Sequence, residues 1–198
     1  MYDLFGGTGA WSQFYRQDPD YQVIVVDPLA KASGSLRMSV QEFLHNIYLY
    51  PKAHGVLAAP PCQNFAASNR KHWSKIPQRE LDKSINNVRA ALAVIKIMKP
   101  KWWALENPVG RIHKLVPEVG VKRLMFDPYE FAEYHNPSTN RYCKRTIIWG
   151  EFTRPKKKPI PPVGESPIHH YRGPRKMRSL VRSITPSGFA RAYYEVNK

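Results

Sequence analysis

A glycine-rich turn near the start of the chain, with an acidic strand end about 20 residues later, restricts the fold more than any other feature. Residues 3–9 read DLFGGTG, the end of a buried strand that runs into the turn, and an amphipathic stretch follows from Ala10 to Gln17. Glycines allow positive φ angles and close approach of a ligand to the backbone. Residues 23–27 read VIVVD, so Asp27 lies where Rossmann-type sheets carry a ribose-binding carboxylate. The alternative for Asp27 is a turn residue before Pro28.

The remaining apolar runs alternate between strand and helix patterns. Residues 55–59, 101–105 and 142–149 read as strands, and residues 41–50 read as a helix. Apolar residues recur at spacings of four and three from Leu81 to Ile95, which predicts a helix with one face on a sheet. Residues 119–125 form either a helix or a helix–strand connection, and residues 63–78 are polar and irregular. The succession predicts an α/β, Rossmann-like fold, with helices on both faces of a mostly parallel sheet.

A cysteine follows the strand predicted at 55–59, in the sequence Pro60-Pro61-Cys62-Gln63. The two prolines fix the backbone just before the thiol, at the edge of an open α/β sheet where ligands bind. Cys143 is the only other cysteine, so a disulfide framework is not expected. Cys62 is therefore either a positioned nucleophile or a small buried apolar residue.

Glu106 and Asn107 follow the strand predicted at 101–105, so we expect them at the same edge as Cys62. A thiolate can add to an electron-poor carbon of a heteroaromatic ring while an acid protonates a ring nitrogen. The structural alternatives are a carboxylate at a helix N-terminus for Glu106 and a turn residue for Asn107.

The charge of the chain favours a polyanionic partner. Lys and Arg number 31 against 15 Asp and Glu, a formal net charge of +16, which points to nucleic acid rather than only to a solvated basic surface. No apolar run approaches the roughly 20 residues that span a membrane. Two cysteines and no secretory signal predict a reducing cytoplasm. We expect no metal.

These motifs resemble, in order, those of the DNA cytosine-5 methyltransferases. The glycine turn at 3–9 resembles the family's S-adenosylmethionine motif, and residues 60–65 resemble its nucleophile motif. Glu106-Asn107-Pro108 is similar to its Glu-Asn-Val motif, and residues 144–150 to its arginine-bearing strand. Residues 182–196 resemble the last motif. The compact form is most similar to small bacteriophage members, which implies action in a host cytoplasm.

The resemblance implies a role for each matching residue. Cys62 would attack C6 of a cytosine, Glu106 would contact N3, and Asn107 would order the cysteine loop. Arg145 would contact the flipped base or its phosphate. The residues implied at the cofactor are Asp3, Phe5, Gly6, Gly7, Thr8, Gly9, Asp27, Pro28, Pro60, Arg182 and Ser183.

The resemblance also implies three regions. They are a Rossmann-like catalytic domain at 1–150, a short basic loop region at 151–180 in place of a target-recognition domain, and a C-terminal motif with a helix at 181–198 that packs back on the catalytic domain. Cys143 stands where the family has an arginine, so we expect it to be a buried strand residue. The residues expected to bind DNA are Gln63, Asn64, Arg70, Lys71, Lys156, Lys157, Arg172, Arg175 and Lys176.

Three alternatives remain open from the residues. Arg182 could pair with the carboxylate of carboxy-S-adenosylmethionine, so that the product would be 5-carboxymethylcytosine, or it could bind a DNA phosphate. The substrate could be RNA instead of DNA. The chain could also be an inactive nucleic-acid-binding module, although intact Cys62 and Glu106 argue against that interpretation.

Overall fold

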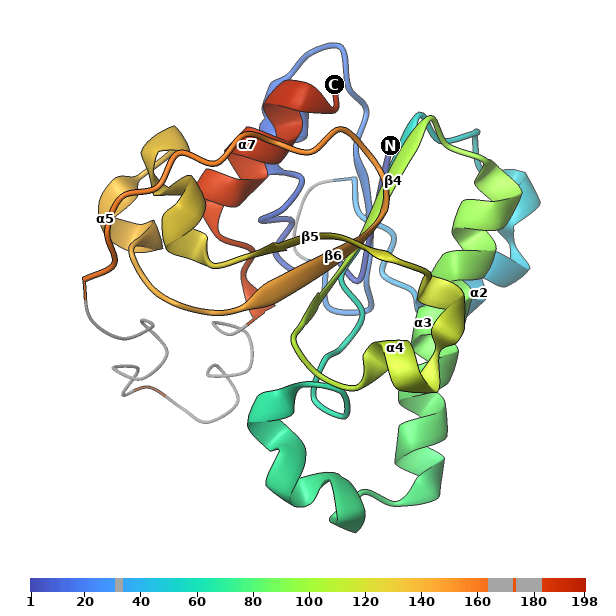
Figure 1. The fold of residues 1–198 in the computed structure, drawn as a ribbon. Coiled ribbons are helices and arrows are strands. Elements are labelled where there is room, and N and C mark those ends of the chain that lie inside the picture. Colours follow the sequence, from blue (N-terminus) through green and yellow to red (C-terminus); the bar gives the residue numbers. More distant parts are fainter. Residues whose placement is uncertain (31–33, 164–172, 174–182) are drawn as a thin grey trace.

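A mixed β-sheet forms the centre of the molecule. The computed structural model describes residues 1–30, 34–163, 173 and 183–198 (Figure 1). Within them the sheet has six strands in the order β2-β1-β3-β4-β6-β5. Strands β1 to β4 pair in parallel, whereas β6 runs antiparallel to both β4 and β5. The predicted fold class, a mostly parallel α/β sheet, is confirmed. The strands are Tyr2–Leu4, Ile24–Val26, Gly55–Ala58, Trp102–Pro108, Lys122–Phe126 and Thr146–Glu151 for β1 to β6.

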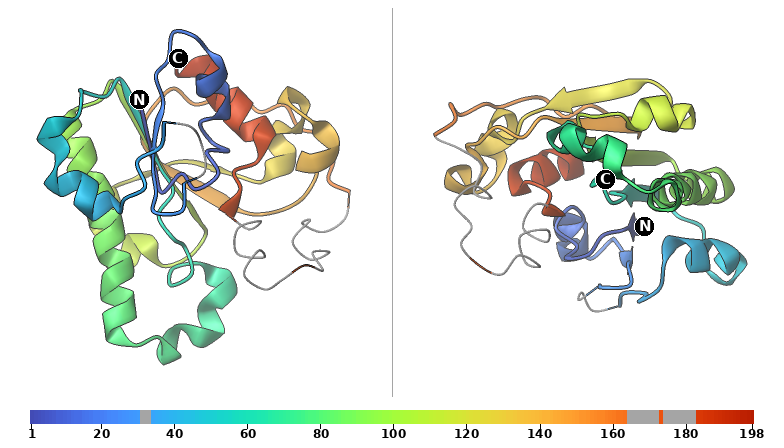
Figure 2. Two further views of the ribbon diagram at one scale, coloured as in Figure 1. Left: turned by 180° about the vertical axis from the view of Figure 1, so that it is seen from behind. Right: turned by 90° about the horizontal axis from the view of Figure 1, so that it is seen from below.

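Helices cover both faces of this sheet, as Figure 2 shows from two directions. Helices α2 and α3 lie on one face, and α1 and α7 lie on the other. The α-helices are α1 (Gln13–Gln17), α2 (Val40–His45), α3 (Gln78–Met98), α4 (Ile112–Leu115), α5 (Pro137–Asn140) and α7 (Ser187–Val196). The 3₁₀ helices are η1 (Ile47–Leu49), η2 (Ala67–Lys75), η3 (Pro117–Val119) and η4 (Pro128–Tyr134).

Local sequence explains where helix α2 begins and where helix α3 ends. Ser39 and Glu42 form a capping box at the start of α2, in which each side chain bonds the other residue's backbone N–H. Helix α3 ends at Met98, and the capping residue Lys99 has a left-handed backbone and precedes a proline that cannot continue the helix.

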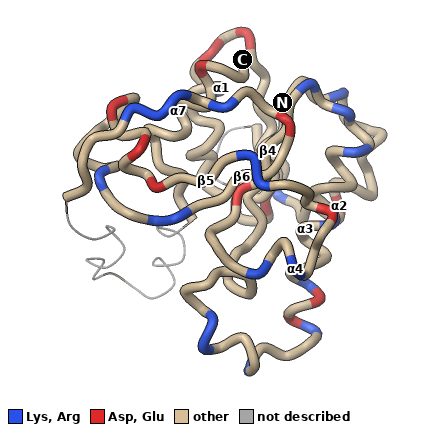
Figure 3. The backbone as a smooth tube through the Cα atoms, viewed as in Figure 1, with Lys and Arg blue, Asp and Glu red and all other residues tan. Residues whose placement is uncertain are grey.

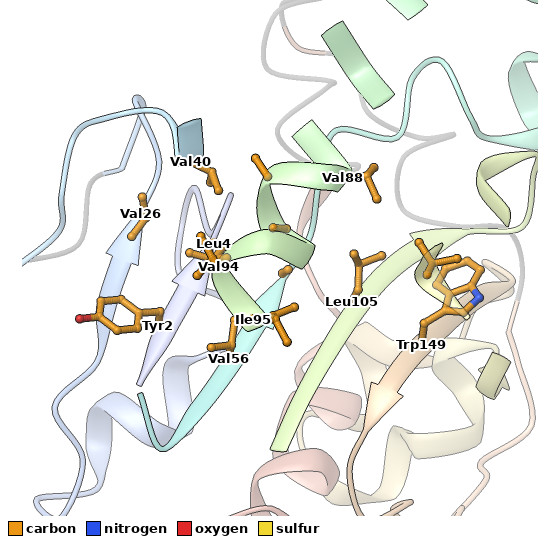
Figure 4. Packing of buried hydrophobic residues seen from close by; sticks show 14 of the residues in the cluster. Tyr2, Leu4, Val26, Val40, Val56, Val88, Val94, Ile95, Leu105 and Trp149 are labelled. Carbon is orange, nitrogen blue, oxygen red and sulfur yellow. The ribbon is translucent and has the colours of Figure 1, made fainter. Parts of the chain in front are cut away.

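Alternate side chains of the strands pack into two separate hydrophobic cores, one on each face of the sheet. Val56 and Ala58 of β3 face the core under α2 and α3, whereas Leu57 faces the other core. Leu105 and Trp149 join the first core (Figure 4), and their neighbours Ala104 and Ile148 join the second. Neighbouring residues of a strand thus point to opposite faces, so both faces of the central strands are buried and the strands read as continuous apolar runs.

The second core is an aromatic cluster around α7. Phe189 is fully buried, stacks on Phe126 with ring centroids 4.1 Å apart, and contacts the rings of Trp11, Phe131 and Tyr193. Phe126 ends β5 and Phe131 lies on η4, so this cluster docks the last helix against elements from the middle of the chain.

Several element boundaries differ from those that the sequence predicts. Residues 119–125 end a 3₁₀ turn and form most of β5, and the helix predicted at 41–50 is split between α2 and η1. Strand β4 continues through Pro108, because Glu106, Asn107 and Pro108 pair with β6. The expectation of a buried Cys143 was wrong: β6 begins only at Thr146, and Cys143 is exposed on the preceding loop.

No helix in the described part of the chain has the length and apolar character needed to cross a membrane.

Truncating the centre of the aromatic cluster should destabilise the fold. Phe189→Ala should lower the free energy of unfolding by about 3–5 kcal/mol, because it leaves a cavity where a buried ring contacted several others. Tyr48→Ala is the control, since Tyr48 is 87% exposed and its loss should cost less than about 0.5 kcal/mol. Urea denaturation of both variants measures the difference. Equal stability of the two variants would contradict the assigned packing of α7.

Candidate active site at the carboxyl edge of the sheet

Three predicted motifs meet at one edge of the sheet. Leu4, Ala58 and Leu105 are register partners in the adjacent parallel strands β1, β3 and β4. The glycine turn, the cysteine turn and Glu106 therefore emerge within a few residues of the same row. This is the lower edge in Figure 1, beyond which η2 and the first turns of α3 project. Ligands of open α/β sheets bind outside this carboxyl edge.

The glycine turn has the backbone that its sequence predicts. Gly7 and Gly9 have φ angles of +49° and +68°, and Phe5 also lies in the left-handed region with φ of +58°. A non-glycine residue at positive φ stores backbone strain, which clusters at functional sites. The turn closes on itself, because Gly9 N donates to the carbonyl oxygen of Gly6 over 2.7 Å.

Asp3 lies next to the glycine turn. Its side chain is 1% exposed, and one oxygen accepts a hydrogen bond of 2.6 Å from the Ser12 hydroxyl. The other carboxylate oxygen has no hydrogen-bond partner among the described residues. Burial raises the pKa of Asp3 to about 6, against the opposing effects of Ser12 and Arg16. The structure thus places Asp3 beside the turn, where its carboxylate holds the Ser12 hydroxyl.

Asp27 lies beside the glycine turn, where the spacing predicts a ribose partner. One carboxylate oxygen accepts from Gly7 N over 3.2 Å, and the other accepts from Leu29 N over 2.7 Å. The side chain is half-buried, Pro28 is exposed and Thr8 is half-buried. Each carboxylate oxygen can accept a second hydrogen bond, so Asp27 can bind hydroxyl groups without losing either backbone contact. A strained open turn beside such a carboxylate fits a nucleoside cofactor.

The cysteine turn is ordered by backbone hydrogen bonds. The carbonyl oxygen of Cys62 accepts from both Phe65 N and Ala66 N, each over 2.9 Å. Asn107 lies fully buried on the neighbouring strand, and its side-chain amide donates to the carbonyl oxygen of Pro60 over 3.1 Å. The Cys62 side chain is half-buried. The structure therefore brings Asn107 to the cysteine turn, as the resemblance implies.

The surroundings of Glu106 favour the protonated form of its carboxyl. It lies in β4, two residues before the end of the strand, and burial raises the pKa of its carboxyl, with Lys144 opposing this effect. Burial, and secondly Glu106, raises the pKa of Tyr142 to about 12. The charge of Lys144 thus acts on the Glu106 carboxyl, and that carboxyl in turn acts on Tyr142, although sequence reasoning singled out neither residue. Only the antiparallel β4–β6 pairing brings the segment before β6 alongside Glu106.

Arg145 precedes β6 and is held by an ion pair. Its Nε lies 2.7 Å from Oδ2 of the buried Asp127, which raises the pKa of Arg145. Asp127 also caps η4 through Glu130. The Arg145 side chain is 57% exposed, so the pair fixes its stem at the same edge and leaves part of the guanidinium accessible.

The residues predicted to bind nucleic acid fall into different environments. Gln63, Arg70, Lys71 and Lys156 are exposed, and Figure 3 shows basic positions on the projecting segment of η2 and α3. The Asn64 amide instead donates to Ser84 Oγ and to the Glu80 carbonyl oxygen on α3. Lys157 pairs with Glu130 over 2.7 Å. Ser183 is exposed, whereas Arg172, Arg175, Lys176 and Arg182 lie outside the described residues.

Two other features of the structure bear on its chemistry. No group of three His, Cys, Asp or Glu side chains in the described ranges could hold a metal ion. An open, mainly apolar groove of about 790 Å³ lies between α3 and the strands β5 and β6, lined in part by Trp103, Val121 and Phe152. None of the predicted site residues lines it, so the carboxyl edge remains the site that carries reactive groups.

No family model matches the chain, and no curated protein matches it in sequence. A solved structure described as a "putative DNA modification methyltransferase" encoded within a prophage (E. coli) is similar, with a TM-score of 0.50 and 13% sequence identity. The match covers 81% of this chain and 52% of the other, so the chain spans about half the length of that protein. At this identity the likeness shows the fold alone. It agrees with the sheet order and places the chain in the methyltransferase fold.

The buried carboxyl of Asp3 should make stability depend on pH. Its pKa of about 6 in the folded chain lies above the ordinary value of 3.8, so folding favours the protonated form. This contribution is complete below about pH 4 and is lost as the pH rises through 6, a change of about 3 kcal/mol. Asp3→Asn keeps an acceptor for Ser12 but cannot ionise, so its unfolding free energy should fall less over this range. Urea denaturation at pH 4 and pH 7.5 tests this, and identical pH profiles would contradict it.

Proposed function

We propose that the chain is an S-adenosylmethionine-dependent DNA methyltransferase that acts on C5 of cytosine. The observation that carries the proposal is the hydrogen bond from Asn107 to the Pro60 carbonyl oxygen. It ties the cysteine turn to the strand end that bears Glu106, so a nucleophile and an acid of raised pKa share one edge. The glycine turn and Asp27 lie at that same edge.

Covalent addition by Cys62 would make C5 of cytosine reactive enough to accept a methyl group. C5 of cytosine is a weak nucleophile in the aromatic ring. A bond from the Cys62 thiolate to C6 moves the electrons of the C5–C6 double bond toward C5, while the Glu106 carboxyl donates a proton or hydrogen bond to N3. After C5 takes the methyl group, transfer of the C5 proton to a water molecule and expulsion of the thiolate restore the double bond, and N3 returns its proton to the Glu106 carboxylate.

The raised pKa of Glu106 supports this role. A carboxyl with an ordinary pKa is ionised at neutral pH and cannot donate a proton to N3. Burial of Glu106 favours the protonated form, and general acids work best when their pKa lies near the working pH.

The glycine turn and Asp27 would hold the cofactor. Backbone groups of residues 5–9 would contact its amino-acid part, and Asp27 would accept hydrogen bonds from the ribose hydroxyls. The cofactor, when bound, supplies an electrophilic methyl group on a sulfonium ion. Its placement at the edge that bears Cys62 would bring that methyl group to the ring.

A duplex hides both faces of a cytosine, so the base must be flipped out or be presented in a single strand. The exposed Arg70 and Lys71 would contact the phosphate backbone beside the flipped base. The charge of +16 supports DNA as the partner.

DNA that carries 5-fluorocytosine should trap the enzyme covalently in the presence of S-adenosylmethionine, because C5 cannot lose fluorine as it loses a proton. The wild type should form a complex that is stable to denaturing electrophoresis. Cys62→Ala should form none, and Glu106→Gln should react about 10²–10⁴ times more slowly. Cys143→Ser is the matched control and should trap like the wild type, since Cys143 is exposed on a loop.

Binding of S-adenosylhomocysteine by each variant, measured by calorimetry, controls for folding. Trapping by Cys62→Ala, or loss of trapping in Cys143→Ser alone, would refute the assignment of the nucleophile.

A further inference from the structure

The segment directly after β4 holds the cysteine turn at several points. Ala67 N donates to the Val109 carbonyl oxygen over 2.8 Å, and Arg111 N donates to the Phe65 carbonyl oxygen over 2.9 Å. Between them, Ala66 and Gly110 form an antiparallel bridge. A Cβ at Gly110 would lie 1.9 Å from the Phe65 carbonyl oxygen, so only glycine permits this approach. The segment that follows the strand bearing Glu106 thus holds the turn that bears Cys62.

The Arg111 side chain adds a further contact to the cysteine turn. Its Nε donates to the Asn64 carbonyl oxygen, two residues after Cys62, over 3.0 Å. Its guanidinium carbon lies 4.5 Å from the centre of the Trp73 ring, a cation–π contact with η2. Arg111 therefore joins three parts of the chain: the end of β4, the cysteine turn and the basic η2 helix.

The Arg111 guanidinium is partly removed from water, which lowers the stability of the fold and is not needed for a residue that only adds charge to the surface. Its Nη2 is buried without a hydrogen-bond partner in the described part of the chain, and burial lowers the pKa of the guanidinium. Partly unsatisfied cations persist where their geometry is needed. The side-chain amide of Asn64 donates to Ser84 Oγ over 2.9 Å. Asn64 is therefore held at its carbonyl oxygen by Arg111 and at its side chain by Ser84.

We propose that Arg111 is a positioning residue, which fixes the Cys62 turn relative to Glu106 and couples that turn to η2 through Trp73. Arg111 acts through the Asn64 carbonyl oxygen and the Trp73 ring, not on the base. In catalysis this role rests on the proposed function, since it holds Cys62 in line with C6. A displacement of about 1 Å at a reacting group costs about 10²-fold in rate.

The reactivity of Cys62 toward iodoacetamide tests the positioning without any substrate. Mass spectrometry of the two cysteine peptides gives the alkylation rate of Cys62 relative to that of the exposed Cys143 in the same molecule. Arg111→Met removes a hydrogen bond from a charged donor, so the half-buried Cys62 turn should open more often and the ratio should rise about tenfold. Arg111→Lys should recover part of this change, because it keeps the charge but not the planar stack.

The methyl-transfer assay supplies the second measurement. Arg111→Met should lower kcat about 10²-fold while KM for DNA changes little. Arg89→Met is the control, since Arg89 of α3 forms an exposed ion pair with Glu118 of η3 and should match the wild type in both assays. Trp73→Phe keeps a ring under the cation, so its alkylation ratio and its kcat should lie between those of the wild type and those of Arg111→Met. If Arg111→Met does not fold, Trp73→Phe takes its place in both assays.

An unchanged alkylation ratio in the Arg111 and Trp73 variants would overturn the proposal, as would an unchanged kcat. A raised ratio in a protein whose wild type transfers no methyl group would support the positioning of Cys62 and reject the proposed function instead.

Discussion

The parallel register of β1, β3 and β4 is the constraint on which the site depends. Leu4, Ala58 and Leu105 lie side by side in the sheet, and all three are fully buried. A slip of one residue in any of these strands would exchange its two faces and transfer apolar side chains from one core to the other. The hydrophobic cores therefore determine which loops end at the same edge, and so bring the glycine turn, Cys62 and Glu106 together.

The buried polar groups at this edge lower the stability of the fold, and the burial of apolar side chains in the two cores offsets that loss. Asp3, Glu106 and Asn107 all lie in or directly beside buried strand ends, and one oxygen of Asp3 and one of Asn107 lack hydrogen-bond partners within the described residues. A buried polar atom without a hydrogen-bond partner destabilises a fold by about 1–3 kcal/mol. Burial is also what raises the pKa of Asp3 and of Glu106.

Features that depend on short stretches of chain were predictable from the sequence, whereas those that depend on distant pairing were not. The glycine turn, the strand before Cys62 and the apolar face of α3 follow from local patterns. The antiparallel insertion of β6 between β4 and β5 does not, and it extends β4 through Pro108 and brings Lys144 and Tyr142 to Glu106. Arg111 was not predicted from the sequence, because its contacts with Asn64 and Trp73 depend on how η2 folds back.

Mass spectrometry of nucleosides from DNA incubated with the protein and S-adenosylmethionine tests the central claim most directly. A methyl group carried on isotope-labelled cofactor should appear as labelled 5-methyl-2′-deoxycytidine, and it should be absent from reactions with Cys62→Ala. Label found only on adenine or on cytosine N4 would contradict the account, because neither product requires a thiolate adduct at C6. Folded protein that binds the cofactor and DNA yet leaves every nucleoside unlabelled would contradict it as well.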